Sequence, residues 1–323
     1  MRVRGVVFWG LMTLLMLPAV ALTLVRIVEP ESALTIQALA FTPFALPVYA
    51  AALMLLGGAA IRSSGSRLPL LAPALLALAG LAAHAWWFAP QIVGDSPAPR
   101  AGAESLTVMT SNLYFGNGDA VSLVKQASEQ EVDILVVNEI TERGLADMGR
   151  VGLDQLFPYQ VGRPGDSIEG TMVFSREEIE VVKTLDTPMA SFAIETGGVT
   201  ILAVHPSPPT QADLWVEDHR IVLAAAEDLD PDVVAGDFNA TPDHAPMRAL
   251  ADAGFRDTAE LANAVFQPTW PANGEYPPLG LLPPTAPIDH VLVSDDLAVV
   301  ETGTTRLGGT DHRPVVAEIA VRG

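Results

Sequence analysis

The sequence predicts an α+β fold with two layered sheets, preceded by three transmembrane helices. Three long apolar runs lie within the first 90 residues. From residue 105 onward, apolar stretches of strand length are mixed with amphipathic stretches of helix length. Four of the expected strands, at 170–175, 179–184, 190–195 and 199–205, follow one another without a helix between them. Meanders mixed with helices are typical of an α+β layered architecture.

The candidate spans are residues 5–25, 32–61 and 68–89, and none of these runs contains Asp, Glu, Lys or Arg. At ~1.5 Å per residue each is long enough for a hydrocarbon core of ~30 Å. Pro43 and Pro47 should kink or tilt the second span. Trp86 and Trp87, at the end of the third, suit a membrane interface. Residues 1–90 are therefore expected to form a membrane domain.

Charges beside the spans predict their orientation. Arg2 and Arg4 precede the first span, and residues 62–67 place Arg62 and Arg67 on the same side after two crossings. In the intervening loop, Arg26 is offset by two glutamates. The positive-inside rule then puts the N-terminus in the cytoplasm and the chain after the third span outside it. An Ala19-Val20-Ala21 triplet raises the alternative of a cleaved signal peptide, but two remaining spans still leave the tail outside.

The remaining chain divides into a linker and one larger domain. Residues 91–104 are rich in Pro, Gly and Ala and are expected to be a tether. Residues 105–323 should form the larger domain. Its other expected strands are 106–110, 133–137, 231–239, 288–293, 297–302 and 314–321, its helices are 119–130, 211–229 and 243–253, and residues 260–287 are a proline-rich loop.

The larger domain is strongly acidic. The chain carries 18 Lys and Arg and 38 Asp and Glu, a net charge of −20. Residues 1–104 hold six of the basic and four of the acidic side chains, so residues 105–323 carry a net charge of −22. Such a surface repels nucleic acid unless a basic patch intervenes, and no run of Lys or Arg supplies one. The absence of Cys excludes both disulfides and thiolate metal sites.

A short apolar strand at 233–239 ends in Gly236-Asp237-Phe238-Asn239. Alternation along a strand would point Asp237 and Asn239 into one cavity and pack Phe238 behind them. A carboxylate can orient or deprotonate a water, and an amide N–H can hold an oxygen that gains charge. Alone, the motif also fits a strand end with a polar turn.

Other expected strand ends carry side chains of the same kind. Asn112 and Glu139 each follow an apolar strand, and a carboxylate with amide help there suits a hard cation such as Mg²⁺. His205 ends another strand, and Asp289 begins one. Asp311 and His312 stand before the last strand, where an aspartate oriented against the histidine would favour its charged form. Each site taken singly also has an ordinary structural interpretation.

Together these motifs resemble the endonuclease/exonuclease/phosphatase superfamily of DNase I-like metal-dependent phosphoesterases. Five matches over 105–323 carry the resemblance, in the expected order: TSN at 110–112, NE at 138–139, VHP at 204–206, GDFN at 236–239 with IDH at 288–290, and TDHRPV at 310–315. The resemblance implies a four-layer α/β sandwich and a Mg²⁺- or Mn²⁺-dependent attack of water on a phosphoester. Asn138 replaces the usual Gln and Thr310 the usual Ser, and both are expected to be outer positions.

Residue roles follow from this resemblance. Glu139 would be the metal ligand, with Asn112 and Asp311 near the metal. Asp237 would position or activate the water, while Asn239 and His205 contact phosphoryl oxygens. Asp289 would orient His312, which stabilises the developing charge.

The three-span anchor is similar to that of actinomycete membrane phosphatases associated with teicoplanin resistance, which are thought to act on undecaprenyl-linked phosphates. The run from PTWP at 268–271 to IDHVLV also fits them, although Pro287 stands where relatives commonly carry Arg. We therefore expect a multi-pass, extracytoplasmic phosphatase whose partners are the lipid bilayer and a lipid-linked phosphate. Leu279, Leu281 and Leu282 are candidates for contact with lipid, or they simply cover the core. The alternatives are an extracellular nuclease and a non-catalytic binding module, and the sequence indicates no protein partner.

Overall fold

The computed structural model describes residues 3–264, 266–273 and 283–323. The chain forms two compact units, residues 1–90 and 91–323. The three leucines considered for lipid contact, at 279, 281 and 282, lie outside the described residues.

The first unit consists of α1 (Val3–Val28), α2 (Ala33–Leu39), η1 (Thr42–Phe44), α3 (Ala45–Arg62) and α4 (Leu68–Phe88). Three stretches, Gly5–Val28, Thr42–Arg62 and Leu68–Gln91, are long and apolar enough to cross a membrane. The second expected span is divided, because the helix stops after Leu39 and resumes through η1, which has a proline in its first turn. These helices support membrane anchoring. The second span begins at Thr42 rather than at residue 32.

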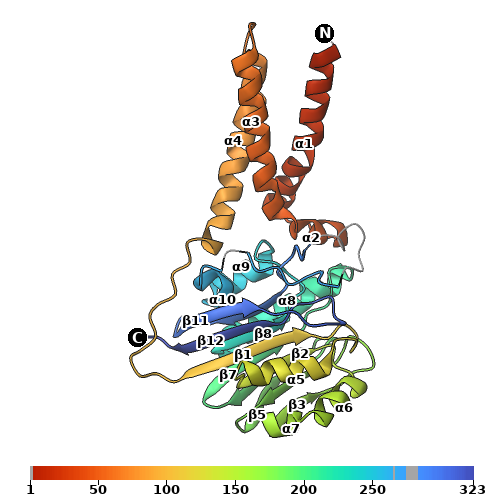
Figure 1. Ribbon diagram of the computed structural model, residues 1–323, viewed down its shortest axis with the longest axis vertical. Helices are drawn as coiled ribbons and strands as arrows, with labels where there is room; N and C mark the ends of the chain where they lie inside the picture. Colours follow the sequence, from red (N-terminus) through yellow and green to blue (C-terminus); the bar gives the residue numbers. More distant parts are fainter. Residues whose placement is uncertain (1–2, 265, 274–282) are drawn as a thin grey trace. The chain divides into compact units, whose positions relative to one another are not determined.

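Two mixed six-stranded sheets make up the second unit (Figure 1). The first has the order β11-β12-β1-β2-β4-β3 and the second β5-β6-β7-β8-β10-β9. The first sheet contains β1 (Ser105–Asn112), β2 (Ile134–Asn138), β3 (Tyr159–Arg163), β4 (Thr171–Ser175), β11 (Leu297–Thr304) and β12 (Val315–Val321). The second contains β5 (Ile179–Thr184), β6 (Phe192–Thr196), β7 (Val199–Val204), β8 (Val233–Asp237), β9 (Arg256–Asp257) and β10 (Asp289–Val293). Only β1–β2 and β7–β8 are parallel pairs in these sheets.

Helices cover the outer faces of the two sheets. On the first sheet lie α5 (Ala120–Glu129), α6 (Glu142–Arg150) and α7 (Leu153–Leu156), and on the second α8 (Ala212–Leu229) and α9 (Ala245–Asp252) (Figure 1). Helix α10 (Thr258–Leu261) packs instead between β11 of the first sheet and β9 and β10 of the second, with Leu261 in the core between the sheets. Between the sheets, β-branched side chains such as Val136, Val173 and Ile201 form one buried core. Removing each such side chain from water contributes about 1.5–3 kcal/mol. The four layers confirm the predicted α+β sandwich.

Three features differ from the expectations. The structure adds α6, α7 and β3 between 139 and 170, where no element was expected, and β9 and α10 near the proline-rich loop. Strand β8 ends at Asp237 rather than at 239. Residues 96–100, expected to lie in a free tether, hydrogen-bond to β11 and β12: Ser96 Oγ accepts from Val299 N (2.8 Å), and Arg100 N donates to Val321 O (2.9 Å).

Candidate active site

Strand pairing gathers the motif residues at one edge of the two sheets. In the first sheet Asn112, the last residue of β1, lies beside Asn138, the last residue of β2. In the second sheet Asp237, the last residue of β8, lies directly opposite Asp289, the first residue of β10. Neighbouring residues in an antiparallel pair have Cβ atoms about 4.5–5.5 Å apart, so these two carboxylates are forced into proximity.

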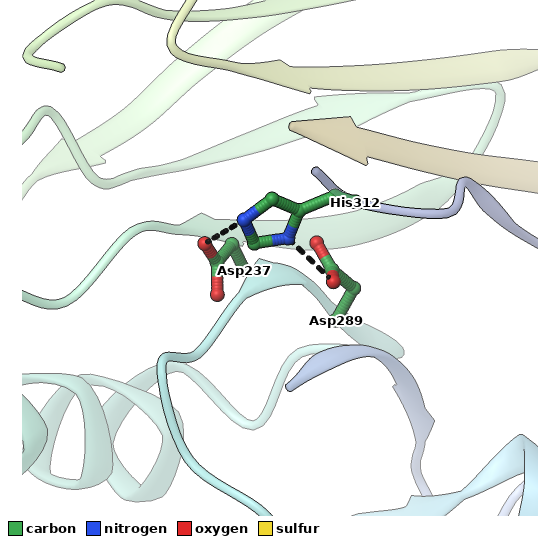
Figure 2. Close-up of side chains that lie close together, drawn as sticks. All are labelled: Asp237, Asp289 and His312. Atoms are coloured by element: carbon green, nitrogen blue, oxygen red, sulfur yellow. Dashed lines mark hydrogen bonds and ion pairs between the residues drawn. The ribbon is translucent and has the colours of Figure 1, made fainter. Parts of the chain in front are cut away.

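His312 lies between these two aspartates (Figure 2). Its Nδ1 is 2.8 Å from Asp289 Oδ2, and its Nε2 is 3.8 Å from Asp237 Oδ2. All three side chains are buried. Asp289 therefore fixes the ring orientation and leaves Nε2 directed toward Asp237.

Asn112 connects Asp237 to Glu139. Its Nδ2 donates to Asp237 Oδ2 (2.9 Å) and to Glu139 Oε1 (3.1 Å), while its Oδ1 accepts from Tyr114 N (2.8 Å). The other Glu139 oxygen accepts from Phe115 N (2.7 Å). Asn112 thus bridges two carboxylates with its nitrogen, and in this arrangement its oxygen serves the backbone.

His205 and Asn239 reach the same site from neighbouring loops. His205 Nε2 is 3.9 Å from Glu139 Oε1 and 3.9 Å from Asp237 Oδ2. Asn239 has a left-handed backbone, and its Nδ2 donates to Pro206 O (3.1 Å). A turn after β8, rather than strand alternation, therefore brings Asn239 to the site. Gly236 allows β8 to lie close to β7 at this point, because a Cβ there would lie 2.0 Å from Val204 O.

Asp311 completes the group. Its Oδ2 accepts from Trp270 Nε1 (2.9 Å), while its Oδ1 is buried without a hydrogen-bond partner and lies 3.6 Å from His312 Nε2. All eight predicted site residues are thereby linked through short contacts: Asn112, Glu139, His205, Asp237, Asn239, Asp289, Asp311 and His312.

Burial and mutual charge separate the protonation states of these groups. Burial, reinforced by the charge of Asp289, raises the pKa of Asp237 to about 7. Burial disfavours the charged form of His312 and so lowers its pKa. The negative charges of Asp289 and Asp237 outweigh this effect and raise the pKa of His312 to about 10. Burial and the positive His312 lower the pKa of His205 to about 3. Near neutral pH, His312 is therefore a cation and His205 is neutral.

The sequence profile of the endonuclease/exonuclease/phosphatase family matches residues 109–312, which is more than half of the chain. The chain belongs to the endonuclease/exonuclease/phosphatase family. No curated protein sequence matches it.

Solved structures of this family share the fold. An AP endonuclease from Archaeoglobus fulgidus has 16% identity over 66% of this chain and 98% of its own, with a TM-score of 0.53. A Neisseria 3′ phosphatase bound to a product DNA hairpin has 17% identity over 66% and 98%, with a TM-score of 0.53. A family protein from Bacteroides thetaiotaomicron has 18% identity over 68% and 99%, with a TM-score of 0.50. These relatives include a nuclease and a phosphatase, so the shared fold does not choose between the two activities.

A divalent cation, typical of the family, fits the residues present. Burial raises the pKa values of Glu139 and Asp311, which indicates buried carboxylates short of positive charge. Oxygen ligands of this kind suit Mg²⁺ or Mn²⁺. Asp237, Asp289 and His312 also offer ligand atoms within 4.8 Å of one another. The Nδ1 atom of His312 is already bonded to Asp289 Oδ2, however, which leaves the carboxylates of Glu139 and Asp311 as the candidate ligands.

Two supporting residues received no detailed role from the sequence. Asn138, expected at an outer position of the site, is fully buried and supports Asp237 through its backbone N–H. Trp270, which orients Asp311, received no role. Neither shows a local pattern that separates it from a core or loop residue, and only the tertiary structure reveals its contacts.

Proposed function

We propose that this protein is a membrane-anchored, extracytoplasmic, divalent-metal-dependent phosphatase acting on a lipid-linked phosphate or pyrophosphate of the undecaprenyl type. The observation that carries the proposal is the convergence of all eight motif residues in a chain that also has three span-length apolar helices. A complete constellation argues against a non-catalytic binding module.

In the proposed reaction, Glu139 and Asp311 hold the cation, and Asn112 keeps Glu139 in place. A bound Mg²⁺ or Mn²⁺ supplies Lewis-acid stabilisation of the phosphoryl charge. Asp237, with a pKa of about 7, is suited to take a proton from the attacking water near neutral pH. The His312 cation stabilises charge that develops on a phosphoryl oxygen, while Asn239 and neutral His205 position the phosphate.

Charge and anchoring support the substrate class. The net charge of −22 on residues 105–323 disfavours a nucleic-acid backbone. An enzyme fixed to the bilayer meets lipid-linked substrates at high local concentration. The arginines beside the spans, at positions 2, 4, 62 and 67, support an extracytoplasmic active site.

The test is Mg²⁺-dependent hydrolysis by the full-length protein in detergent or nanodiscs, measured as phosphate release from phosphomonoesters and pyrophosphates, phosphocholine release from sphingomyelin and strand cleavage of DNA. The panel comprises undecaprenyl phosphate and pyrophosphate, sphingomyelin, inositol phosphates and DNA, and Glu139→Gln is the matched inactive control. We expect hydrolysis of an undecaprenyl substrate and little cleavage of DNA. Preferential cleavage of DNA would instead establish a nuclease, and no Mg²⁺-dependent hydrolysis of any substrate would refute the phosphoesterase assignment.

A further inference from the structure

Asn138 makes hydrogen bonds that join the two sheets at the catalytic edge. It is the last residue of β2, and its side chain is fully buried. Its Nδ2 donates to Val204 O in β7 (3.2 Å), and its Oδ1 accepts from Asp237 N in β8 (3.0 Å). Nδ2 also donates to Thr171 Oγ1 in β4 (3.2 Å), so both ends of the amide are engaged.

The two contacts with the second sheet each reach a residue of the site or its immediate neighbour. Asn138 itself precedes Glu139, Val204 precedes His205, and Asp237 is held directly through its backbone N–H. Glu139 comes from the first sheet, whereas His205 and Asp237 follow or end strands of the second. The apolar core between the sheets is non-directional and does not by itself fix their spacing to a fraction of an ångström. A buried amide whose oxygen and nitrogen are both hydrogen-bonded does fix the spacing of the sheets, because leaving Val204 O or Asp237 N unpaired costs free energy.

We propose that Asn138 is the positioning residue that sets the distance between Glu139 on one sheet and Asp237 and His205 on the other. This inference rests on the proposed metal-dependent phosphatase function. An apolar side chain of similar volume would keep the core filled but leave Asp237 N–H and Val204 O without this partner. The sheets would then settle at a slightly different spacing. Glu139, the cation ligand, and Asp237, the general base, would no longer lie at the distance that the reaction requires.

The same strand pair supplies a control. Ser175 Oγ lies 2.7 Å from Thr196 Oγ1, a second buried hydrogen bond between the sheets. Ser175 pairs with Ile134, four residues before Asn138 along β2 and about 13 Å from the catalytic edge at 3.3 Å per residue. Ser175→Ala therefore removes an inter-sheet contact of the same kind, away from the site.

The experiment compares Asn138→Leu with Ser175→Ala in the full-length protein. The measurements are thermal midpoint, kcat and KM for a small soluble phosphoester, and Mn²⁺ affinity by calorimetry. Residues that orient metal ligands typically contribute 10–100-fold to metal affinity or activity. We expect Asn138→Leu to lower kcat and weaken Mn²⁺ binding by 10–100-fold with KM changed less than threefold. Ser175→Ala should stay within twofold of wild type in both, at a similar thermal midpoint.

Equal effects of the two variants would overturn the inference, since they would indicate a purely structural role. If Asn138→Leu does not fold, Asn138→Ser replaces it, because a hydroxyl cannot span both partners. Failure of the proposed function is distinguishable. If the wild-type protein binds Mn²⁺ but hydrolyses no phosphoester, the proposed phosphatase function is wrong. The Mn²⁺ affinities of Asn138→Leu and Ser175→Ala would still test the role of Asn138. Wild type that binds no Mn²⁺ overturns both.

Discussion

Substituting Asp289 by Asn should discharge His312 at alkaline pH, where the wild-type side chain is still a cation. Asparagine keeps the shape and an acceptor oxygen for His312 Nδ1 but removes the charge 2.8 Å away. Two unit charges at that distance interact by about 6 kcal/mol at an effective dielectric constant of about 20. Burial opposes this attraction, and the net rise of the His312 pKa from 6.5 to about 10 corresponds to about 5 kcal/mol.

The sign of the effect follows from the direction of that shift. Because the folded pKa is raised, the ion pair contributes stability that is fully present below pH about 6.5 and is lost as the pH rises through about 10. In Asp289→Asn, Asp237 remains as a counter-charge, so we expect the pKa of His312 to fall by at least about 2 units. A fall of about 2 units leaves about 10% of His312 charged at pH 9, against about 90% in the wild type, so kcat at pH 9 should fall by at least about 10-fold.

NMR titration of the imidazole nitrogens, together with kcat as a function of pH, measures both effects. Asp257→Asn is the matched control, since it removes the carboxylate 2.6 Å from Nδ1 of the neighbouring buried histidine, His290. It should shift the pKa of His290 and leave that of His312 in place. The reasoning is refuted if His312 in Asp289→Asn stays protonated at pH 9, or if that variant retains wild-type kcat.

Three further predictions concern the cation, the general base and the topology. Glu139→Gln should keep the fold and lower kcat by at least about 100-fold at saturating Mg²⁺, and near-normal turnover would remove Glu139 from the site. Asp237→Ala and His312→Ala should be strongly non-additive, so a double mutant whose loss equals the product of the single losses would indicate independent action. A reporter active only in the cytoplasm should be silent when fused after Gly323 and active after Ser64; a strong signal from the first fusion would contradict an external active site.

The sequence located the candidate site because its chemistry sits at strand ends. A strand end is recognisable where an apolar run stops at Asn112, Glu139 or His205. The fold then gathers such ends at one edge of the sheets, as the pairing of Asp237 with Asp289 illustrates. The local backbone was less predictable: Asn239 reaches the site through a left-handed turn that strand alternation does not describe.

The elements that were missed carry weak signals of their own. Helix α6 has the sequence ERGLADMGR, which is short and mostly polar and contains two glycines, residues that favour helices poorly. Strand β3 reads YQVGR and is largely exposed, and β9 has only two residues. The contacts of Asn138 were not predicted for a different reason. Its three partners lie 33, 66 and 99 positions away in the chain, so no local pattern reports them.

The docking of residues 96–100 determines where the catalytic unit can be cut from the chain. Gly323 N donates to Ala98 O (3.0 Å), and Pro99 forms an antiparallel bridge with Arg322. Residues 98–100, near the start of the second unit, therefore lie beside Arg322 and Gly323. A fragment without the membrane-spanning helices should begin near Gln91. A fragment that starts at Ser105 would lack residues 98–100, which hydrogen-bond to the end of β12 and the residues after it. The adjacency also suits circular permutation, with a short linker joining the two ends and new termini opened in a surface loop.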